Sequence, residues 1–220
     1  MSEARRPTTV RQSELVAAAL DIIATRGIAA LTTRALAERV GLSTGAIFKH
    51  FASLEALLLA VVAHVAEVLA STFPDPSLPA VERLARFVER RSQAVAGSSG
   101  IQQLMLSEQF LLALPAEGAA TLERCADDSR RFVHRCVEEG QAAGGIRADL
   151  PAPAVTLVVM GTAQMLARMR TKRRLPAAEA RRVLDTLMAM LAPPGDARAS
   201  DHVASTRLVS KKAPTTRRRH

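Results

Sequence analysis

The residues best suited to binding chemistry are concentrated in one short segment, residues 32–51. Within it, Ser43, Thr44, Lys49 and His50 place hydroxyl, ammonium and imidazole groups close together in the chain. Such groups form hydrogen bonds with phosphate oxygens and with the edges of bases. The pattern therefore predicts contact with a nucleic acid.

The small and apolar residues of the segment predict two short helices around a tight turn. Ala37 is small where two helices would touch, Gly41 suits a left-handed turn, and Ile47 falls on the inner face of the second helix. A helix-turn-helix unit, whose second helix reads the DNA major groove, has this anatomy. An ordinary helical hairpin with a glycine turn is the alternative. The remaining residues of the predicted small core are Leu36, Val40, Leu42 and Phe51.

Hydroxyl residues precede both predicted helices. Thr32 or Thr33 can cap the first and Ser43 the second, because a hydroxyl there accepts a backbone N–H that has no partner in the helix. Gly45 leaves the start of the second helix bare, so its backbone could approach a phosphate closely.

Specific DNA contacts follow from these positions. For base edges we predict Lys49 on guanine, and Thr44 or Ala46 on a thymine methyl group. The residues predicted to position the DNA backbone are Thr33, Ser43, Gly45, Phe48 and His50.

Residues 10–60 resemble the DNA-binding segment of the TetR/AcrR family of bacterial transcriptional regulators. The resemblance implies a homodimer that binds a palindromic operator, with an effector pocket in a helical bundle and an interface made by the last two helices. It is carried by Arg26-Gly27, Thr32-Thr33, Leu36-Ala37, Gly41-Leu42-Ser43, Gly45-Ala46-Ile47-Phe48-Lys49-His50-Phe51 and Ser53-Leu54-Glu55-Ala56-Leu57.

Two residues depart from the family pattern. Phe48 stands where the family usually has Tyr, whose hydroxyl bonds a phosphate, and Leu54 stands where it usually has Lys. Loss of a hydrogen bond to a charged group removes about 1–3 kcal/mol per half-site. We therefore expect affinity to depend more on Lys49, His50, the helix N-termini and the basic N-terminal arm.

Composition predicts an all-α protein with an anionic partner. The 220 residues are 48% hydrophobic and 3% aromatic, without Trp or Tyr, and alanine and leucine favour helices. The net charge of +9 suits DNA without identifying it. We expect about nine helices: a helix-turn-helix head of three helices, a connector helix and a C-terminal bundle for ligand binding and dimerisation.

The domain boundaries follow from helical periodicity and from breaks at proline and glycine. Residues 1–9 are predicted as a flexible basic arm, 10–52 as the DNA-binding head, and 53–73 as the connector helix. Residues 74–192 are predicted as the ligand-binding and dimerisation domain, and 193–220 as a disordered basic tail. Helices over 154–171 and 177–191 are the predicted dimer interface, closure of the monomer core being the alternative.

The bundle offers one candidate ligand site. Glu108 falls within an apolar stripe of a helix predicted over residues 101–114, where a carboxylate could orient a cationic or hydroxylated ligand. A place at the rim, or pairing with an arginine, is the alternative. The other predicted lining residues, for which ordinary core packing is the alternative, are Met105, Phe110, Phe132, Met160 and Met165.

The sequence indicates neither an enzyme nor a metal or cofactor site. None of the five histidines forms a pair with metal-ligand spacing, and no nucleophile stands beside a matched base. Cys125 and Cys136 are predicted as buried free thiols, with an intermolecular bridge or redox sensor as the alternative. The polar N-terminus and the short apolar run at 154–167 predict a cytoplasmic protein without a membrane segment.

The favoured prediction is a sequence-specific, DNA-binding transcriptional regulator, a homodimeric repressor released by a small-molecule effector. Two alternatives remain from the sequence. One is a TetR-like protein that acts through a protein partner or as a non-specific architectural DNA binder. The other is a helical enzyme or carrier with a buried site.

Overall fold

The computed structural model describes residues 8–106, 108–171 and 175–195, and only the backbone at residues 8, 99, 105, 106, 108–110 and 171. These residues form helices and connecting turns without a strand, which confirms the all-α prediction. The elements are α1 (Thr8–Arg26), η1 (Ile28–Ala30), α2 (Thr33–Val40), α3 (Thr44–Ile47), α4 (Leu54–Ala70), α5 (Ala80–Ala96), α6 (Ser99–Leu106), α7 (Glu108–Ala113), α8 (Ala116–Ala142), α9 (Ala152–Thr171) and α10 (Ala177–Leu191).

The turn between α2 and α3 forms as the sequence predicts. The Thr32 hydroxyl accepts the N–H of Ala35 at 3.1 Å and so caps α2. Gly41 ends α2 in the left-handed region with φ 68°, and the N–H of Leu42 reaches back to the Ala37 carbonyl at 2.9 Å. Glycine adopts this conformation without the penalty that a Cβ brings. The turn therefore fixes the angle at which α3 leaves α2.

α3 is shorter than the sequence pattern predicts. A helix is expected over residues 44–51, whereas the α-helix ends at Ile47. Residues 48–50 continue as tighter turns, in which the N–H of His50 donates to the Ile47 carbonyl at 2.9 Å. This winding brings Phe51 into the core, where its side chain is buried. The expected recognition helix is thus one α-helical turn followed by tighter turns.

The first of two hydrophobic cores joins the head, α1 to α3, to helices that follow it in the chain. Leu15, Leu36 and Ile47 are buried here together with residues from α4, α6 and α8. The buried residues from those later helices include Leu57, Leu58, Val61, Val62, Val65, Leu69, Ile101, Leu104 and Leu122. The head and the predicted connector helix therefore share one core, and α6 belongs to it as well.

The second core holds the far end of the molecule. It is built from α5, the C-terminal half of α8, α9 and α10, with Phe87 packed against Phe73 and Phe132 at ring-centroid distances of 5.7 and 5.2 Å. α10 begins and ends where the sequence predicts, at residues 177 and 191. Its buried residues are Ala180, Leu184, Leu187 and Leu191, whereas Val183 is exposed.

The helix predicted over residues 101–114 is the main departure in the bundle. Two shorter helices, α6 and α7, take its place and raise the α-helix count of the described residues from about nine to ten. Leu112 lies on α7 and is 87% exposed, so burial on all sides does not explain the apolar composition of this stretch. Apolar composition alone could not indicate the break, because it does not say which neighbours are available to cover the helix.

The packing of α9 explains part of its apolar composition. By length and composition alone, the stretch Ala152–Arg170 could cross a membrane, with a mean hydropathy of 1.2. Core helices of soluble proteins meet the same criterion, and Val155, Val159 and Ala163 pack in the second core. The opposite face of α9 carries apolar side chains to the surface.

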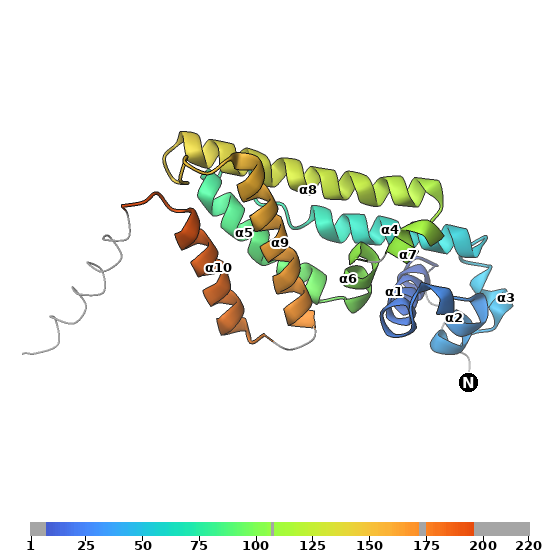
Figure 1. The fold of residues 1–220 in the computed structure, drawn as a ribbon. Helices are drawn as coiled ribbons and strands as arrows, with labels where there is room; N and C mark the ends of the chain where they lie inside the picture. The colour runs from blue at the N-terminus through green and yellow to red at the C-terminus, as the bar shows by residue number, and fades with distance from the viewer. Residues whose placement is uncertain (1–7, 107, 172–174, 196–220) are drawn as a thin grey trace, which may run out of the picture.

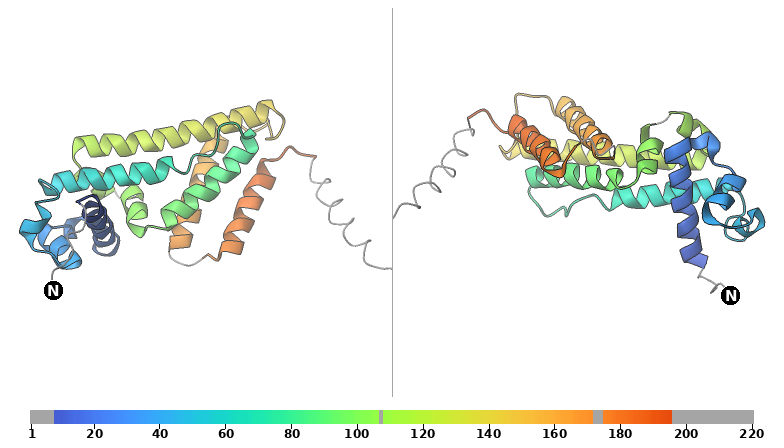
Figure 2. Two further views of the ribbon diagram at one scale, coloured as in Figure 1. Left: turned by 180° about the vertical axis from the view of Figure 1, so that it is seen from behind. Right: turned by 90° about the horizontal axis from the view of Figure 1, so that it is seen from below.

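The two cores lie along one elongated molecule. The head is at one end, α10 is at the other, and the long helix α8 runs beside α4 between them (Figure 1). Figure 2 shows α9 and α10 side by side at the end away from the head. This arrangement places the predicted DNA contacts and the predicted dimer helices at opposite ends of the chain's long axis.

Candidate functional site

The head presents its polar residues along the start of α3 and the turn after it. Ser43, Thr44, Gly45 and Lys49 are exposed, and Ser43 also caps α3 by accepting the N–H of Ala46 at 3.2 Å. The other predicted contacts, Thr33, Ala46 and His50, are partly buried. The structure thus brings all the predicted contacts onto α2, α3 and the following turn. Whether they touch DNA stays a prediction.

Two contacts that the sequence reasoning missed hold this surface against α1. The side-chain amide of Gln12 donates to the His50 carbonyl at 3.0 Å, which fixes the turn after α3. Arg39 on α2 pairs with Asp21 on α1 at 2.9 Å. Both pairs join residues far apart in sequence, so only a model of the head would have revealed them. They make the turn and α2 parts of one rigid unit.

Lys49 and Phe48 are the most open side chains of this surface. Lys49 makes no ion pair with any residue whose side chain is described, so its ammonium is available to an anion. Phe48 is 51% exposed, so its ring is open to contact with another molecule. Leu54, the other departure from the family pattern, is half-buried against the first core.

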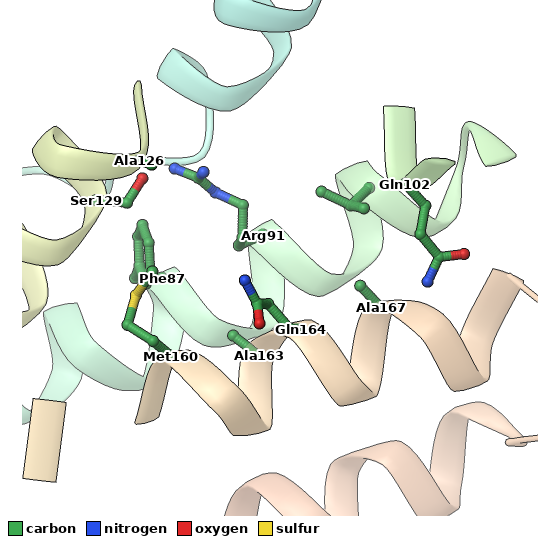
Figure 3. A pocket seen from close by; sticks show the side chains of 10 residues that line it. Phe87, Arg91, Gln102, Ala126, Ser129, Met160, Ala163, Gln164 and Ala167 are labelled. Carbon is green, nitrogen blue, oxygen red and sulfur yellow. The ribbon is translucent and has the colours of Figure 1, made fainter. Parts of the chain in front are cut away.

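A cavity lies between the two cores. Its volume is about 70 Å³, and it is lined by residues of α5, α6, α8 and α9. Figure 3 shows Arg91 of α5 reaching toward Ser129, with Gln102 of α6 toward the other side of the view. Phe87 and Met160 form part of the apolar wall. The cavity is therefore mostly apolar, with a few polar groups from separate helices.

Arg91 is the buried charge of this cavity. It is 7% exposed, and its Nε donates to the Thr72 hydroxyl at 2.8 Å while Nη2 donates to the Leu69 carbonyl at 3.1 Å. Its guanidinium also lies over the Phe73 and Phe87 rings, at 5.4 and 4.8 Å from their centroids. Burial lowers the pKa of Arg91 from its ordinary value to about 10, so the side chain stays charged at neutral pH.

A sequence signal for Arg91 existed. It falls at helical spacing on the same face of α5 as Leu84, Val88 and Val95, all of which are buried. A charged residue within such a stripe marks either an ion pair or a binding site. The prediction from the sequence named Glu108 as the charged residue of the ligand site and did not include Arg91.

The predicted ligand contacts are scattered in the structure. Met160 lines the cavity, whereas Phe132 lies beside Phe87 in the aromatic cluster. Met165 is on the outer face of α9 and is 57% exposed, which is not where a cavity residue belongs. Periodicity along α9 could not distinguish its two apolar faces. The side chains of Met105, Glu108 and Phe110 lie outside the described residues.

A separate apolar surface covers the far end of the molecule. Leu157 and Val158 on α9 are 69% and 53% exposed, and Met190 on α10 is 63% exposed. Val158 and Met190 line one groove with Leu150, of about 340 Å³. Clusters of exposed apolar side chains mark surfaces that another molecule covers.

Other chemistry has little support among the described side chains. They contain no group of three histidine, cysteine or acidic residues able to hold a metal ion. Both cysteines are free thiols, which agrees with the prediction of buried free thiols for Cys136. Cys125 is half-buried. Burial raises the pKa of both thiols, which keeps them protonated and unreactive at neutral pH.

Comparison with known proteins agrees with this anatomy. Residues 15–61 match the family model described as bacterial regulatory proteins, tetR family. No curated protein matches the chain at a significant level. The matched segment spans most of the head and the first half of α4, and so includes the turn, α3 and the residues that bury it.

Solved structures share the whole fold. The ketosteroid transcriptional regulator KstR2 of Mycobacterium tuberculosis has a TM-score of 0.70 at 22% identity, over 83% of this chain and 95% of that one. A tetR-family regulatory protein from Rhodococcus RHA1 has a TM-score of 0.67 at 23% identity, over 82% and 96%. AibR, solved with isovaleryl coenzyme A and operator DNA, has a TM-score of 0.68 at 17% identity, over 84% and 99%.

The family match and the likeness in fold rest on different observations, and both point to one group of proteins. The first rests on sequence in the head, and the second rests on the arrangement of helices over the full described length. Residues 15–61 match the model of the tetR family of bacterial regulatory proteins, and the described part of the chain has the helical fold of TetR-family transcriptional regulators.

Proposed function

We propose that this chain is a cytoplasmic, homodimeric repressor that binds a palindromic operator and releases it when a small molecule enters the bundle. The observation that carries the proposal is the exposed polar surface of α3 and the turn after it, held on a head that is buried against α4. In this reading Lys49, Thr44 and Ala46 meet base edges, and Ser43, Gly45 and Phe48 face the DNA backbone. No catalytic role is proposed.

Dimerisation follows from the small size of α3. One α-helical turn spans about 5 Å and reaches few bases, so a single head would select its site poorly. Two heads related by a twofold axis would read a palindrome. The exposed apolar surface of α9 and α10 supports these helices as the interface, because it would be covered in a dimer.

The cavity supports control by an effector. AibR was solved with both a coenzyme A thioester and operator DNA, so a protein of this fold can bind both kinds of molecule. In this chain Arg91 joins the cavity to the C-terminal end of α4 through Leu69 and Thr72. A ligand that prefers one position of α4 would alter the spacing of the two heads.

The test of the proposal is sequence-specific DNA binding by the purified full chain. Fragments bound from the source genome identify a palindrome, and fluorescence anisotropy then compares it with a scrambled duplex. We expect Lys49→Ala to weaken binding to the palindrome by at least about tenfold, since one base contact contributes about 1–3 kcal/mol. Arg130→Ala is the matched control, because Arg130 is an exposed cation on α8, outside the head.

Non-specific architectural binding is the second candidate, and charge is what favours it. Residues 193–220 hold seven lysines and arginines against two aspartates, so 7 − 2 gives +5 of the total net charge of +9. If this candidate is right, palindrome and scrambled duplex bind equally, and removal of residues 196–220 greatly reduces both the affinity and its salt dependence. That outcome would contradict the repressor.

A further inference from the structure

Among the described side chains, Arg91 is a buried cation without a buried anion to match it. No carboxylate among the described side chains forms an ion pair with it, and its hydrogen bonds to Thr72 and Leu69 go to a hydroxyl and a backbone carbonyl. A guanidinium has five N–H donors, so these bonds do not exhaust its capacity. Burial of an unpaired charge is unfavourable, and an anion in the cavity would relieve it.

Gln102 supplies a second unmet group in the same cavity. It is 8% exposed, and its Nε2 is buried without a hydrogen-bond partner among the described residues. An amide N–H needs an acceptor, and leaving it unpaired is unfavourable. Figure 3 shows Arg91 and Gln102 reaching the cavity from different helices, with the small residues Ala163 and Ala167 along α9 between them. The cavity thus offers one cation, Arg91, and the unpaired amide donor of Gln102, with Ser129 and Gln164 as further neutral polar groups of its lining.

The walls and the volume limit what can fill this space. The remaining lining is largely apolar and includes Phe87, Val95 and Met160. The volume of about 70 Å³ is roughly half that of an engineered cavity that holds benzene, about 150 Å³. A single guanidinium neutralises one negative charge, which suits a carboxylate better than the nearly doubly charged phosphate monoester.

We propose that the effector is a short-chain organic monocarboxylate, bound through its carboxylate by Arg91, with an oxygen acceptor further along its chain facing Gln102. The proposal names the ligand class of the effector site and so rests on the proposed function. Its consequence is mechanical. A carboxylate that draws the guanidinium into the cavity competes with the bonds from Arg91 to Leu69 and Thr72, and so loosens the C-terminal end of α4.

The first experiment compares matched small molecules on the full chain by thermal unfolding. The probes are oxo acids of about three or four carbons, the corresponding primary amides, the unsubstituted acids and alkyl phosphates of equal length. We expect the best oxo acid to raise Tm by about 2–4 °C at saturating concentration, and the unsubstituted acid to do so less. Amides and phosphates should have little effect, and an amide that matches its acid overturns the proposal.

The second experiment locates the carboxylate with variants. Arg91→Gln should weaken binding of the best oxo acid by at least about tenfold, because a charge-assisted pair is lost. Arg91→Lys should recover part of it, since the charge remains without the planar fork. Arg90→Gln is the matched control: it removes the same charge from the neighbouring, exposed position on α5.

Gln102→Leu keeps the proposal testable if Arg91 variants do not fold. It replaces the unpaired amide without touching the bonds to α4, so it should preserve folding and remove the advantage of oxo acids over unsubstituted acids. An unchanged preference for oxo acids in Gln102→Leu overturns the assigned role of Gln102. Unchanged acid binding in Arg91→Gln overturns the assigned role of Arg91.

DNA release separates this proposal from the one on which it rests. Release of the palindrome by the oxo acid, lost in Arg91→Gln, supports both. Binding of the oxo acid without release supports the carboxylate site and contradicts its role as an effector site. Specific DNA binding that is released only by neutral molecules supports the repressor and overturns the carboxylate.

Discussion

At the scale of single residues, the turn between α2 and α3 depends on one backbone conformation. Gly41 has φ 68°, which L-residues with a Cβ adopt only with strain, although no atom stands within 4 Å of the place a Cβ would take. The constraint on this position is therefore conformational and not one of space. Gly45, the second residue of α3, is free of both constraints.

We predict that Gly41→Ala lowers the free energy of unfolding by about 1 kcal/mol, because alanine must hold a left-handed conformation there. Gly45→Ala should leave stability unchanged or raise it slightly, since glycine is the poorer helix former. Urea unfolding followed by circular dichroism measures both variants. Equal stability of the two would show that the turn does not need the left-handed residue.

Cys136 makes stability depend on pH in the alkaline range. Burial raises the pKa of its thiol from 9.0 to about 11, so the folded state holds the proton more tightly than the unfolded chain does. The stabilisation is complete below pH 9 and is lost as the pH rises toward 11. Two pKa units correspond to about 2–3 kcal/mol.

We predict that wild-type protein loses about 2–3 kcal/mol of stability between pH 9 and pH 11 relative to Cys136→Ala, which has no thiol to ionise. The comparison between the two proteins removes the contribution of other groups that titrate in this range. Denaturant titrations at several pH values give the difference. A difference that does not vary with pH would mean that the Cys136 thiol ionises equally well in both states.

At the scale of elements, the contact between α6 and α1 links the bundle to the head. A Cβ at Gly100 would come within 2.5 Å of the Leu20 carbonyl oxygen, which is a clash with backbone. Gly100 lies two residues before Gln102, so the helix that lines the cavity is also the one pressed against α1. Close packing between two helices transmits small displacements, because a packed contact does not deform continuously.

We predict that Gly100→Ala lowers stability by about 1–3 kcal/mol, the usual effect of adding a methyl group where there is no room. It should also weaken DNA binding, because α1 must shift away from α6. Gly97→Ala is the control, since its Cβ would meet the Ala94 carbonyl oxygen at 3.4 Å, a contact at the edge of the ordinary range. Chemical denaturation and anisotropy measure the two effects, and equal behaviour of both variants would contradict the tight contact.

At the scale of the whole molecule, the two ends carry different surfaces. The head presents polar groups at one end, and α9 and α10 present apolar groups at the other (Figures 1 and 2). A dimer through the apolar end would leave both heads free, each at the outer end of a long subunit. Dimerisation, driven by the burial of apolar surface, and DNA recognition would then take place at opposite ends of each subunit.

We predict that the protein is a dimer in solution and that Val158→Asp and Met190→Asp each raise its dissociation constant by at least about tenfold. A carboxylate buried in an apolar interface loses its hydration without gaining a partner. Leu112→Asp is the control, because Leu112 is an equally apolar and more exposed residue on α7, away from this surface. Sedimentation analysis measures the association. A wild-type monomer at micromolar concentration would contradict the interface.

The sequence by itself determined the features that depend on neighbours in the chain. The cap at Thr32, the left-handed Gly41 and the limits of α10 are local, because each is fixed by the bonding and conformational preferences of a few consecutive residues. For the same reason the exposed contacts on α3 and the following turn were predictable as a group. The resemblance to the TetR family rests on these local features.

Only the tertiary structure decided the features that need partners from distant segments. The break between α6 and α7, the exposure of Met165 and the burial of Arg91 depend on which helices come together, and helical periodicity does not encode that. The same apolar stripe can face a core, a cavity or solvent. Arg91, the buried charge of the described cavity, was therefore not predicted from the sequence, and the side chain of Glu108, the acid expected in this part of the bundle, lies outside the described residues.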